Sequence, residues 1–275
     1  MIVERIHLTQ EENGPYIDAY IADALPNYTR KALLVFPGGA YIKLAPREGE
    51  PVAQAFMPYG YNTFVLHYTV NRKRRKPFPS HLIEATLAIK HIKDNADKYG
   101  IDPAEVYVVG FSAGGHLAAS VATMWKNEKI LSAVEMPYGY NRVKGAMLIY
   151  PMVSPDLSNS ETYDKAWRNL FACENPTPEQ LNEAAIERHV DADSSPAFIL
   201  HAFTDPVVDV RNALVLGRAY AEAGVPCEIH VYPEGTHGFS LANEVSAEGR
   251  SEFVDQRLAE WVRLAAEWAK TVKSE

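Results

Sequence analysis

The sequence is poor in cysteine and contains no long hydrophobic run. Its 275 residues include only Cys173 and Cys227, which lie far apart and lack C-x-x-C spacing. Neither a disulfide framework nor a structural zinc site is therefore expected. No stretch approaches the roughly 18 apolar residues of a membrane span, and the first residues, charged from Glu4 onward, lack the apolar segment of a signal peptide. We expect a soluble, cytoplasmic protein.

Positive charge is also scarce. The chain has 27 Lys and Arg against 35 Asp and Glu, a formal net charge of −8, which disfavours nucleic acid or an anionic membrane as a partner. The one basic cluster, NRKRRKP at residues 71–77, is interpreted as a solvated loop. The expected partner is therefore a small molecule, with no nucleic acid and no membrane.

Internal repeats and low-complexity linkers are absent too, so nothing divides the chain into separate units. A hydrophobic content of 47% is enough to fill a sizeable core. We expect a single domain over residues 1–275.

Strands and helices are predicted to alternate along most of this chain. Residues 3–9 and 16–22 are typical of an antiparallel hairpin. Continuous apolar runs, which suit buried parallel strands, occupy residues 31–36, 62–68, 106–109, 146–150, 197–201 and 228–232. Helices are predicted near residues 50–57, 80–99, 113–126, 212–223 and 251–270.

This order predicts an α/β protein with a mostly parallel twisted sheet, N-terminal antiparallel strands and helices on both faces. Residues 152–195 are polar and predict a small, partly helical cap inserted above the sheet. Ligands of such sheets bind beyond the carboxyl ends of the strands, so functional residues are expected in the loops there.

The stretch GFSAGG begins at Gly110 and ends a predicted strand. Gly110, Ser112 and Gly114 form a G-x-S-x-G pattern with a strand before it and a helix after it, which is the context of a nucleophilic serine on a strained turn. Glycine is expected at both flanking positions because the neighbouring chains approach too closely for a side chain. The pattern alone is weak, but its placement favours Ser112 as a nucleophile over an ordinary turn.

A serine nucleophile needs a histidine base and a carboxylate that orients it. Of nine histidines, His237 alone lies in a loop directly after the last predicted strand, and the other eight are interpreted as packed or solvated. The acid of this architecture lies between serine and histidine in the sequence. Asp205 follows a strand and is preferred, and Asp209 remains the alternative, with a helix N-cap as its other role.

Acyl transfer also needs donors for the oxyanion of the carbonyl group. FPGGAY, residues 36–41, follows a predicted strand. The backbone N–H groups of Gly39, Ala40 and Ala113 are the predicted oxyanion hole, and a plain turn of small residues is the alternative for this stretch.

Four stretches together resemble the α/β-hydrolase fold, and within it the small esterase/lipase group that includes acetyl-xylan-esterase-like and acetylesterase proteins. They are FPGGAY with FVLHYTV downstream, GFSAGGHLAAS, SPAFILHAFTDPVVDVRNAL and AEAGVPCEIHVYPEGTHGFSLA. The resemblance implies Ser112 as nucleophile, Asp205 and His237 as its partners, and the oxyanion donors above. Relatives commonly carry a third glycine at Ala40 and a proline at Asp209, and the acid at 209 keeps the alternative open.

The predicted function is a serine carboxylesterase that hydrolyses short-chain, acetyl-type esters through an acyl-enzyme. Acetylated sugars or xylo-oligosaccharides are the leading substrates, on the resemblance, and Tyr41, Trp167 and Phe239 are candidates to stack against a sugar ring. The alternatives are a small peptidase or thioesterase of the same fold, or a non-catalytic ligand-binding relative. This chemistry requires no metal or organic cofactor, and the possibility of a homodimer is left open.

Overall fold

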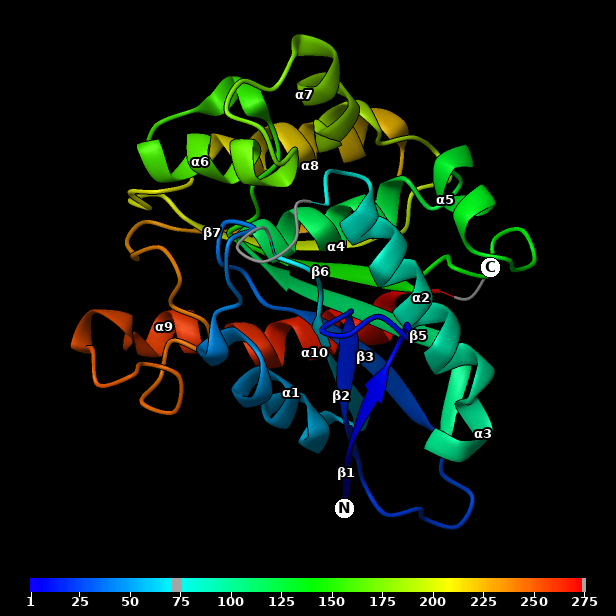
Figure 1. Cartoon of the computed structure of the whole chain (residues 1–275). Coiled ribbons are helices and arrows are strands. Elements are labelled where there is room, and N and C mark those ends of the chain that lie inside the picture. Colours follow the sequence, from blue (N-terminus) through cyan, green and yellow to red (C-terminus); the bar gives the residue numbers. More distant parts are fainter. Residues whose placement is uncertain (71–75, 274–275) are drawn as a thin grey trace.

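A computed structural model describes residues 1–70 and 76–273 (Figure 1). Most of the basic cluster, residues 71–75, lies outside the described residues, so its interpretation as a solvated loop stays a prediction. None of the helices in the described ranges has the length and hydropathy needed to cross a bilayer.

The strands of the described residues form an eight-stranded sheet in the order β1-β2-β4-β3-β5-β6-β7-β8. The first two, β1 (Ile2–His7) and β2 (Tyr16–Ile21), pair antiparallel, and β2 pairs antiparallel with β4 (Tyr61–His67). The remaining pairs are parallel. In these pairs each strand joins its neighbour in the sheet order, from β4 through β8. The strands are β3 (Arg30–Phe36), β5 (Ile101–Phe111), β6 (Gly145–Ile149), β7 (Ala197–Ala202) and β8 (Cys227–Tyr232). The predicted antiparallel start and parallel remainder are confirmed.

Helices cover both faces of this sheet, because alternate residues of each central strand point to opposite faces. In β3, Leu34 belongs to the core on one face, whereas Leu33 and Val35 belong to the core on the other. The first face is covered by α2 (Ser80–Asp94), α3 (Ala96–Tyr99), α4 (Ala113–Thr123), α5 (Glu128–Ala133) and α8 (Arg211–Ala223). The second is covered by α1 (Glu50–Phe56), η5 (Ser251–Phe253), α9 (Gln256–Ala259) and α10 (Trp261–Thr271), with η2 (Met57–Tyr59) following α1.

The predicted insertion, residues 152–195, is largely helical. Figure 1 shows its longer helices beside α8 at the top of the molecule. Its main helix, α6 (Glu161–Leu170), starts where the Ser160 side chain accepts a hydrogen bond from the Tyr163 N–H. The helix buries Tyr163 and Trp167, which is the amphipathic pattern of a helix packed on a core. The insertion comprises η3 (Pro155–Leu157), α6 (Glu161–Leu170), α7 (Pro178–Ala184) and η4 (Ile186–Arg188).

Two predicted helices are each divided by a break. The one over residues 80–99 divides at Asn95, and the one over residues 251–270 divides near Asp255, whose side chain caps α9 by accepting from the N–H groups of Arg257 and Leu258. The apolar periodicity runs through both breaks, so the pattern alone could not reveal them.

Candidate active site

Ser112 lies on the turn between β5 and α4, in a strained backbone conformation with φ 53° and ψ −117°. The two flanking glycines are required by close backbone contacts. A Cβ at Gly110 would lie 2.1 Å from the Gly114 carbonyl oxygen, and a Cβ at Gly114 would lie 2.1 Å from the Phe36 carbonyl oxygen. The turn therefore holds the serine hydroxyl beyond the end of the sheet, at a cost in strain that functional sites commonly carry.

His237 reaches this hydroxyl from the loop after β8. Its Nε2 lies 2.8 Å from Ser112 Oγ, and its Nδ1 lies 2.7 Å from Asp205 Oδ2. A carboxylate only accepts hydrogen bonds, so Nδ1 carries the proton and Nε2 is free to accept the proton of the serine hydroxyl. The structure thus brings together three residues that are far apart in the sequence.

Asp205 holds His237 from a fully buried position after β7. Its Oδ1 accepts hydrogen bonds from the N–H groups of Val207 and Val208, at 2.8 and 2.9 Å. Burial alone would raise the pKa of Asp205, but His237 and His201 outweigh it and hold that pKa well below its usual value. The carboxylate is therefore ionised throughout the neutral range and fixes the orientation of the imidazole.

Asp209, the alternative acid, makes no hydrogen bond to His237 in the described part of the structure. Its side chain accepts from the Arg211 N–H at 2.8 Å and pairs with the Arg211 guanidinium at 2.7 Å. Asp209 thus stabilises the start of α8, close to the capping role considered for it, although Val210 is the N-cap residue.

Two N–H groups of the predicted oxyanion hole are directed by hydrogen bonds on the opposite side of their peptides. The Gly38 carbonyl accepts from the Ala45 N–H at 2.9 Å, and the Gly39 carbonyl accepts from the Ile42 N–H at 3.1 Å. Because the C=O and N–H of a trans peptide point in opposite directions, the N–H groups of Gly39 and Ala40 face away from these turns. Neither N–H has a hydrogen-bond partner among the described residues.

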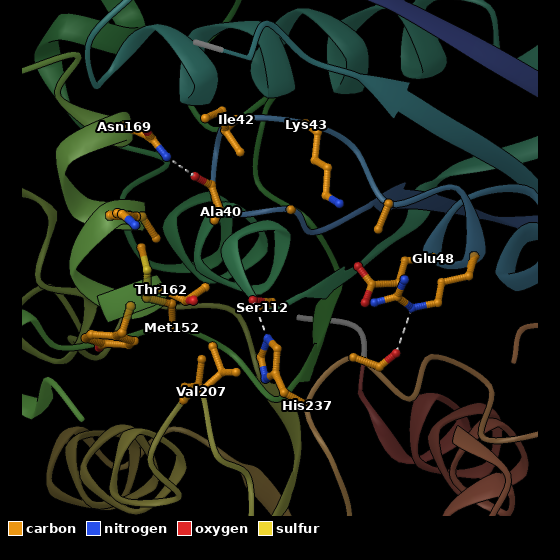
Figure 2. Close-up of a pocket in the computed structure, with 18 of the residues that line it drawn as sticks. Ala40, Ile42, Lys43, Glu48, Ser112, Met152, Thr162, Asn169, Val207 and His237 are labelled. Carbon is orange, nitrogen blue, oxygen red and sulfur yellow. Dashed lines mark hydrogen bonds between the residues drawn. The ribbon is translucent and has the colours of Figure 1, made fainter. Parts of the chain in front are cut away.

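The third predicted donor is the N–H of Ala113, the first residue of α4. The first N–H groups of a helix have no partner within the helix, and they carry its positive dipole end. On the other side of the site, Asn169 in α6 donates from its side-chain amide to the Ala40 carbonyl at 2.8 Å (Figure 2). The loop that carries Ala40 is thereby tied to the insertion.

A cavity of about 410 Å³ opens beside Ser112 and His237. Figure 2 shows the Ser112–His237 pair at its centre, with Ala40 on one side and Val207 on the other. Helix α6 forms one wall, and the loop after β3 forms another. The lining residues are Gly39, Ala40, Ile42, Lys43, Ala45, Pro46, Arg47, Glu48, Ser112, Met152, Thr162, Tyr163, Lys165, Ala166, Asn169, Val207, Val208, His237, Gly238 and Glu248.

The three predicted stacking residues are not on this cavity wall. Tyr41, Trp167 and Phe239 are 0%, 4% and 1% exposed, so none presents a ring face to a ligand. Tyr41 instead donates from its hydroxyl to Nδ1 of His116, behind the serine, at 2.7 Å. The prediction that Tyr41 binds substrate is therefore corrected: backbone turns with φ 55° at both Ala40 and Tyr41 direct its side chain into the core.

The histidines other than His237 are packed or solvated, as expected, and His7, for example, is exposed. His116 is buried, and burial lowers its pKa to about 4. His201 is packed in β7, as expected, but its Nε2 also lies 3.5 Å from Asp205 Oδ2. Within residues 1–70 and 76–273, no group of three or more His, Cys, Asp or Glu side chains is arranged to hold a metal ion.

Comparison with known proteins assigns the chain to a family. The family model described as BD-FAE matches residues 17–219. The chain belongs to the BD-FAE family. The match includes Ser112, Asp205 and the loop after β3, whereas His237 lies beyond the residues that match BD-FAE and is identified by its hydrogen bonds.

Curated relatives of this BD-FAE chain include an endo-1,4-beta-xylanase B of Butyrivibrio fibrisolvens, 32% identical over 84% of this chain and 35% of that protein. An acetylxylan esterase of Xylanibacter ruminicola is 29% identical over 78% of this chain and 42% of that protein. The chain thus spans less than half the length of these two relatives.

Among solved structures, an acetyl ester-xyloside bifunctional hydrolase from Caldicellulosiruptor lactoaceticus matches with a TM-score of 0.80 and 29% identity, over 98% of this chain and 96% of that one. The chain therefore has the α/β-hydrolase fold and belongs to its esterase/lipase group, as the resemblance implied.

Proposed function

We propose that this protein is a serine esterase that hydrolyses short-chain, acetyl-type esters, with Ser112 as nucleophile, His237 as general base and acid, and Asp205 as the residue that orients the base. The observation that carries the proposal is the chain of hydrogen bonds from Asp205 through His237 to Ser112, at 2.7 and 2.8 Å, on the wall of the cavity. Membership of the esterase/lipase group supports the same reaction.

The reaction proceeds in two steps of the same chemistry. Ser112 Oγ attacks the ester carbonyl carbon while His237 Nε2 takes its proton, and the N–H groups of Gly39, Ala40 and Ala113 bind the oxyanion. His237 then gives the proton to the departing alcohol oxygen as the carbon–oxygen bond of the ester breaks. Water attacks the acyl-enzyme with the same base and releases the carboxylic acid.

Short acyl groups on polar alcohols suit the cavity best. Its volume of about 410 Å³ lies near the lower end of ligand cavities, and residues 152–195 act as a small cap over it. Lys43 and Lys165 stand among its lining residues, and such polar groups can bind sugar hydroxyls. Acetylated sugars or xylo-oligosaccharides are the proposed substrates, supported by the acetylxylan esterase and the acetyl ester-xyloside hydrolase among the similar proteins.

Release of nitrophenol from 4-nitrophenyl acetate tests the reaction. Wild type is expected to turn over the ester, and Ser112→Ala is expected to lose at least about 10³-fold in kcat/KM. Equal rates would remove Ser112 from the mechanism. Acetylated xylo-oligosaccharides, aminoacyl amides and acyl-thioesters, assayed side by side, then test the substrate class, and a preference for amides or thioesters would refute the ester assignment.

A further inference from the structure

A buried carboxyl group lies on the cavity wall outside the three residues assigned to catalysis. Glu48, at the end of η1 (Pro46–Glu48), is only 2% exposed and has no ion-pair partner among the described residues. Figure 2 shows it across the cavity from Thr162 and Met152. A buried carboxylate is costly unless it accepts hydrogen bonds, so the bonds that it makes indicate what it does.

Glu48 joins two loops through a hydrogen-bond chain whose direction is determined. The Gly38 N–H donates to Glu48 Oε2 at 2.7 Å, and the Tyr150 hydroxyl donates to Oε1 at 2.9 Å. Tyr150 in turn accepts from the Ser240 N–H at 3.0 Å, so its one proton is committed to Glu48. Burial, with the Glu48 carboxylate nearby, raises the pKa of Tyr150 well above its usual value, which keeps that proton in place.

Both ends of this chain adjoin catalytic groups. Gly38 directly precedes Gly39, whose N–H is a proposed oxyanion donor, and Ser240 lies three residues after His237. The Tyr150 ring also packs edge-on against the His237 ring, with centroids 5.0 Å apart. Tyr150 adopts an unfavourable φ of 39°, a strain that the surrounding contacts must maintain.

The residue before Glu48 ties the same two segments together. Arg47 Nε donates to the Gly238 carbonyl at 2.8 Å, and the Ser240 hydroxyl donates to the Arg47 carbonyl at 2.6 Å. Residues 47–48 therefore bind the histidine loop at Gly238 and Ser240 and the oxyanion loop at Gly38.

We propose that Glu48 is a positioning residue that holds the oxyanion loop and the histidine loop in register, through Gly38 on one side and through Tyr150 and Ser240 on the other. The role rests on the proposed function, because it matters only if both loops serve one reaction. Glu48 anchors the Pro37–Gly38 peptide, which directly precedes the peptide that carries the Gly39 N–H. The anchor thereby helps to preorganise that N–H for the oxyanion, which is where such donors have their effect.

Glutamine cannot replace Glu48 in this chain. Gly38 and Tyr150 both donate to it, and an amide offers one oxygen acceptor and one NH2 donor. Whichever way the amide is turned, one of the two donors loses its acceptor. Glu48→Gln therefore breaks one link while it keeps nearly the same shape, which makes it a sharper variant than alanine.

The test compares wild type, Glu48→Gln and Glu50→Gln in the hydrolysis of 4-nitrophenyl acetate. Glu50 is a matched control because it is an exposed carboxylate in α1, two residues away, whose one side-chain hydrogen bond within the described part of the chain comes from Gln54. We expect Glu48→Gln to lower kcat by roughly 10- to 100-fold with KM within about threefold, and Glu50→Gln to keep wild-type values. Affinity for phenylboronic acid, whose serine adduct mimics the tetrahedral intermediate, should fall with kcat.

A Glu48→Gln protein that unfolds at a lower temperature yet keeps wild-type kcat and boronate affinity would overturn the proposal, since the role would then be structural. If Glu48→Gln does not fold, Tyr150→Phe cuts the same chain one step further on, and it too must lower kcat at unchanged KM or the proposal fails. If Ser112→Ala hydrolysed the ester as fast as wild type, that result would instead overturn the proposed function, and the role of Glu48 with it.

Discussion

Replacing Asp205 by asparagine tests how the base is oriented at the level of single protons. In the wild type, Asp205 Oδ1 accepts from the N–H groups of Val207 and Val208, and Oδ2 accepts from His237 Nδ1. An asparagine must keep its oxygen toward the two backbone donors, because the opposite orientation would place its NH2 group against them. The NH2 group then faces His237.

The consequence for His237 is a change of tautomer. Facing an NH2 donor, Nδ1 becomes the acceptor and the ring proton moves to Nε2, which then donates toward Ser112 Oγ instead of accepting from it. The corresponding exchange in a serine-protease triad lowers kcat about 10⁴-fold, equivalent to about 5 kcal/mol of transition-state stabilisation. We expect a loss of similar size here, with KM changed much less.

Asp209→Asn is the matched control for this experiment. Its oxygen can still accept from the Arg211 N–H, so kcat should stay within about twofold of wild type. Both variants are assayed with 4-nitrophenyl acetate at pH 8, after circular dichroism has established that they fold. An Asp205→Asn enzyme with more than a tenth of wild-type kcat, or a larger loss in Asp209→Asn, would refute the assignment of the acid.

Three further predictions concern the backbone and the buried histidines. Gly114→Ala should lower the free energy of unfolding by at least about 3 kcal/mol, since its Cβ meets a backbone oxygen at 2.1 Å. Gly224→Ala, with φ 72° and no atom within 4 Å, should cost only about 1 kcal/mol, and equal costs in urea titrations would refute the steric argument. Ala40→Gly, which relieves φ 55°, should gain roughly 0.5 kcal/mol in the same assay and keep kcat, because the donor is a backbone N–H; a loss of stability would contradict this. Burial lowers the pKa of His116 to about 4 and that of His81 to about 3, so between pH 6 and 4 the unfolded state binds protons that the folded state does not. Stability should fall over that range by as much as about 1 kcal/mol per pH unit for each histidine, and a flat profile of unfolding free energy would be incompatible with neutral buried rings.

The sheet and its helices could be predicted because the signal is local. Each parallel strand is a continuous apolar run, and a strand buried on both faces requires one. Helix α5 was not predicted because it has only six residues, capped by Asn127, and is too short to show a hydrophobic period. The helix breaks at Asn95 and Asp255 were not predicted for the opposite reason, since the apolar spacing continues through them.

The three residues assigned to catalysis were accessible from the sequence because each follows a strand, and strand ends converge at one edge of a parallel sheet. The contacts that support these three residues could not be predicted from the sequence. Tyr150 links Glu48 to Ser240 by hydrogen bonds. These two residues lie 192 positions apart in the sequence (240 − 48), and no spacing rule connects them. His201 lies one position before the end of a buried strand, where an apolar environment favoured packing as the interpretation, although its distance of four residues from Asp205 was a usable signal.

Ala40 illustrates how such contacts accommodate a non-glycine residue in a left-handed backbone conformation, with φ 55°. A left-handed backbone costs an alanine about 1 kcal/mol or more relative to glycine. Here the peptides on both sides of Ala40 are held, one by the bond from the Ile42 N–H to the Gly39 carbonyl and the other by the bond from Asn169 to the Ala40 carbonyl. A hydrogen bond contributes about 0.5–1.5 kcal/mol net, which is enough to offset the strain. The amide of Ala40 can thus face the cavity without glycine, and the helix that makes this possible belongs to the insertion rather than to the sheet.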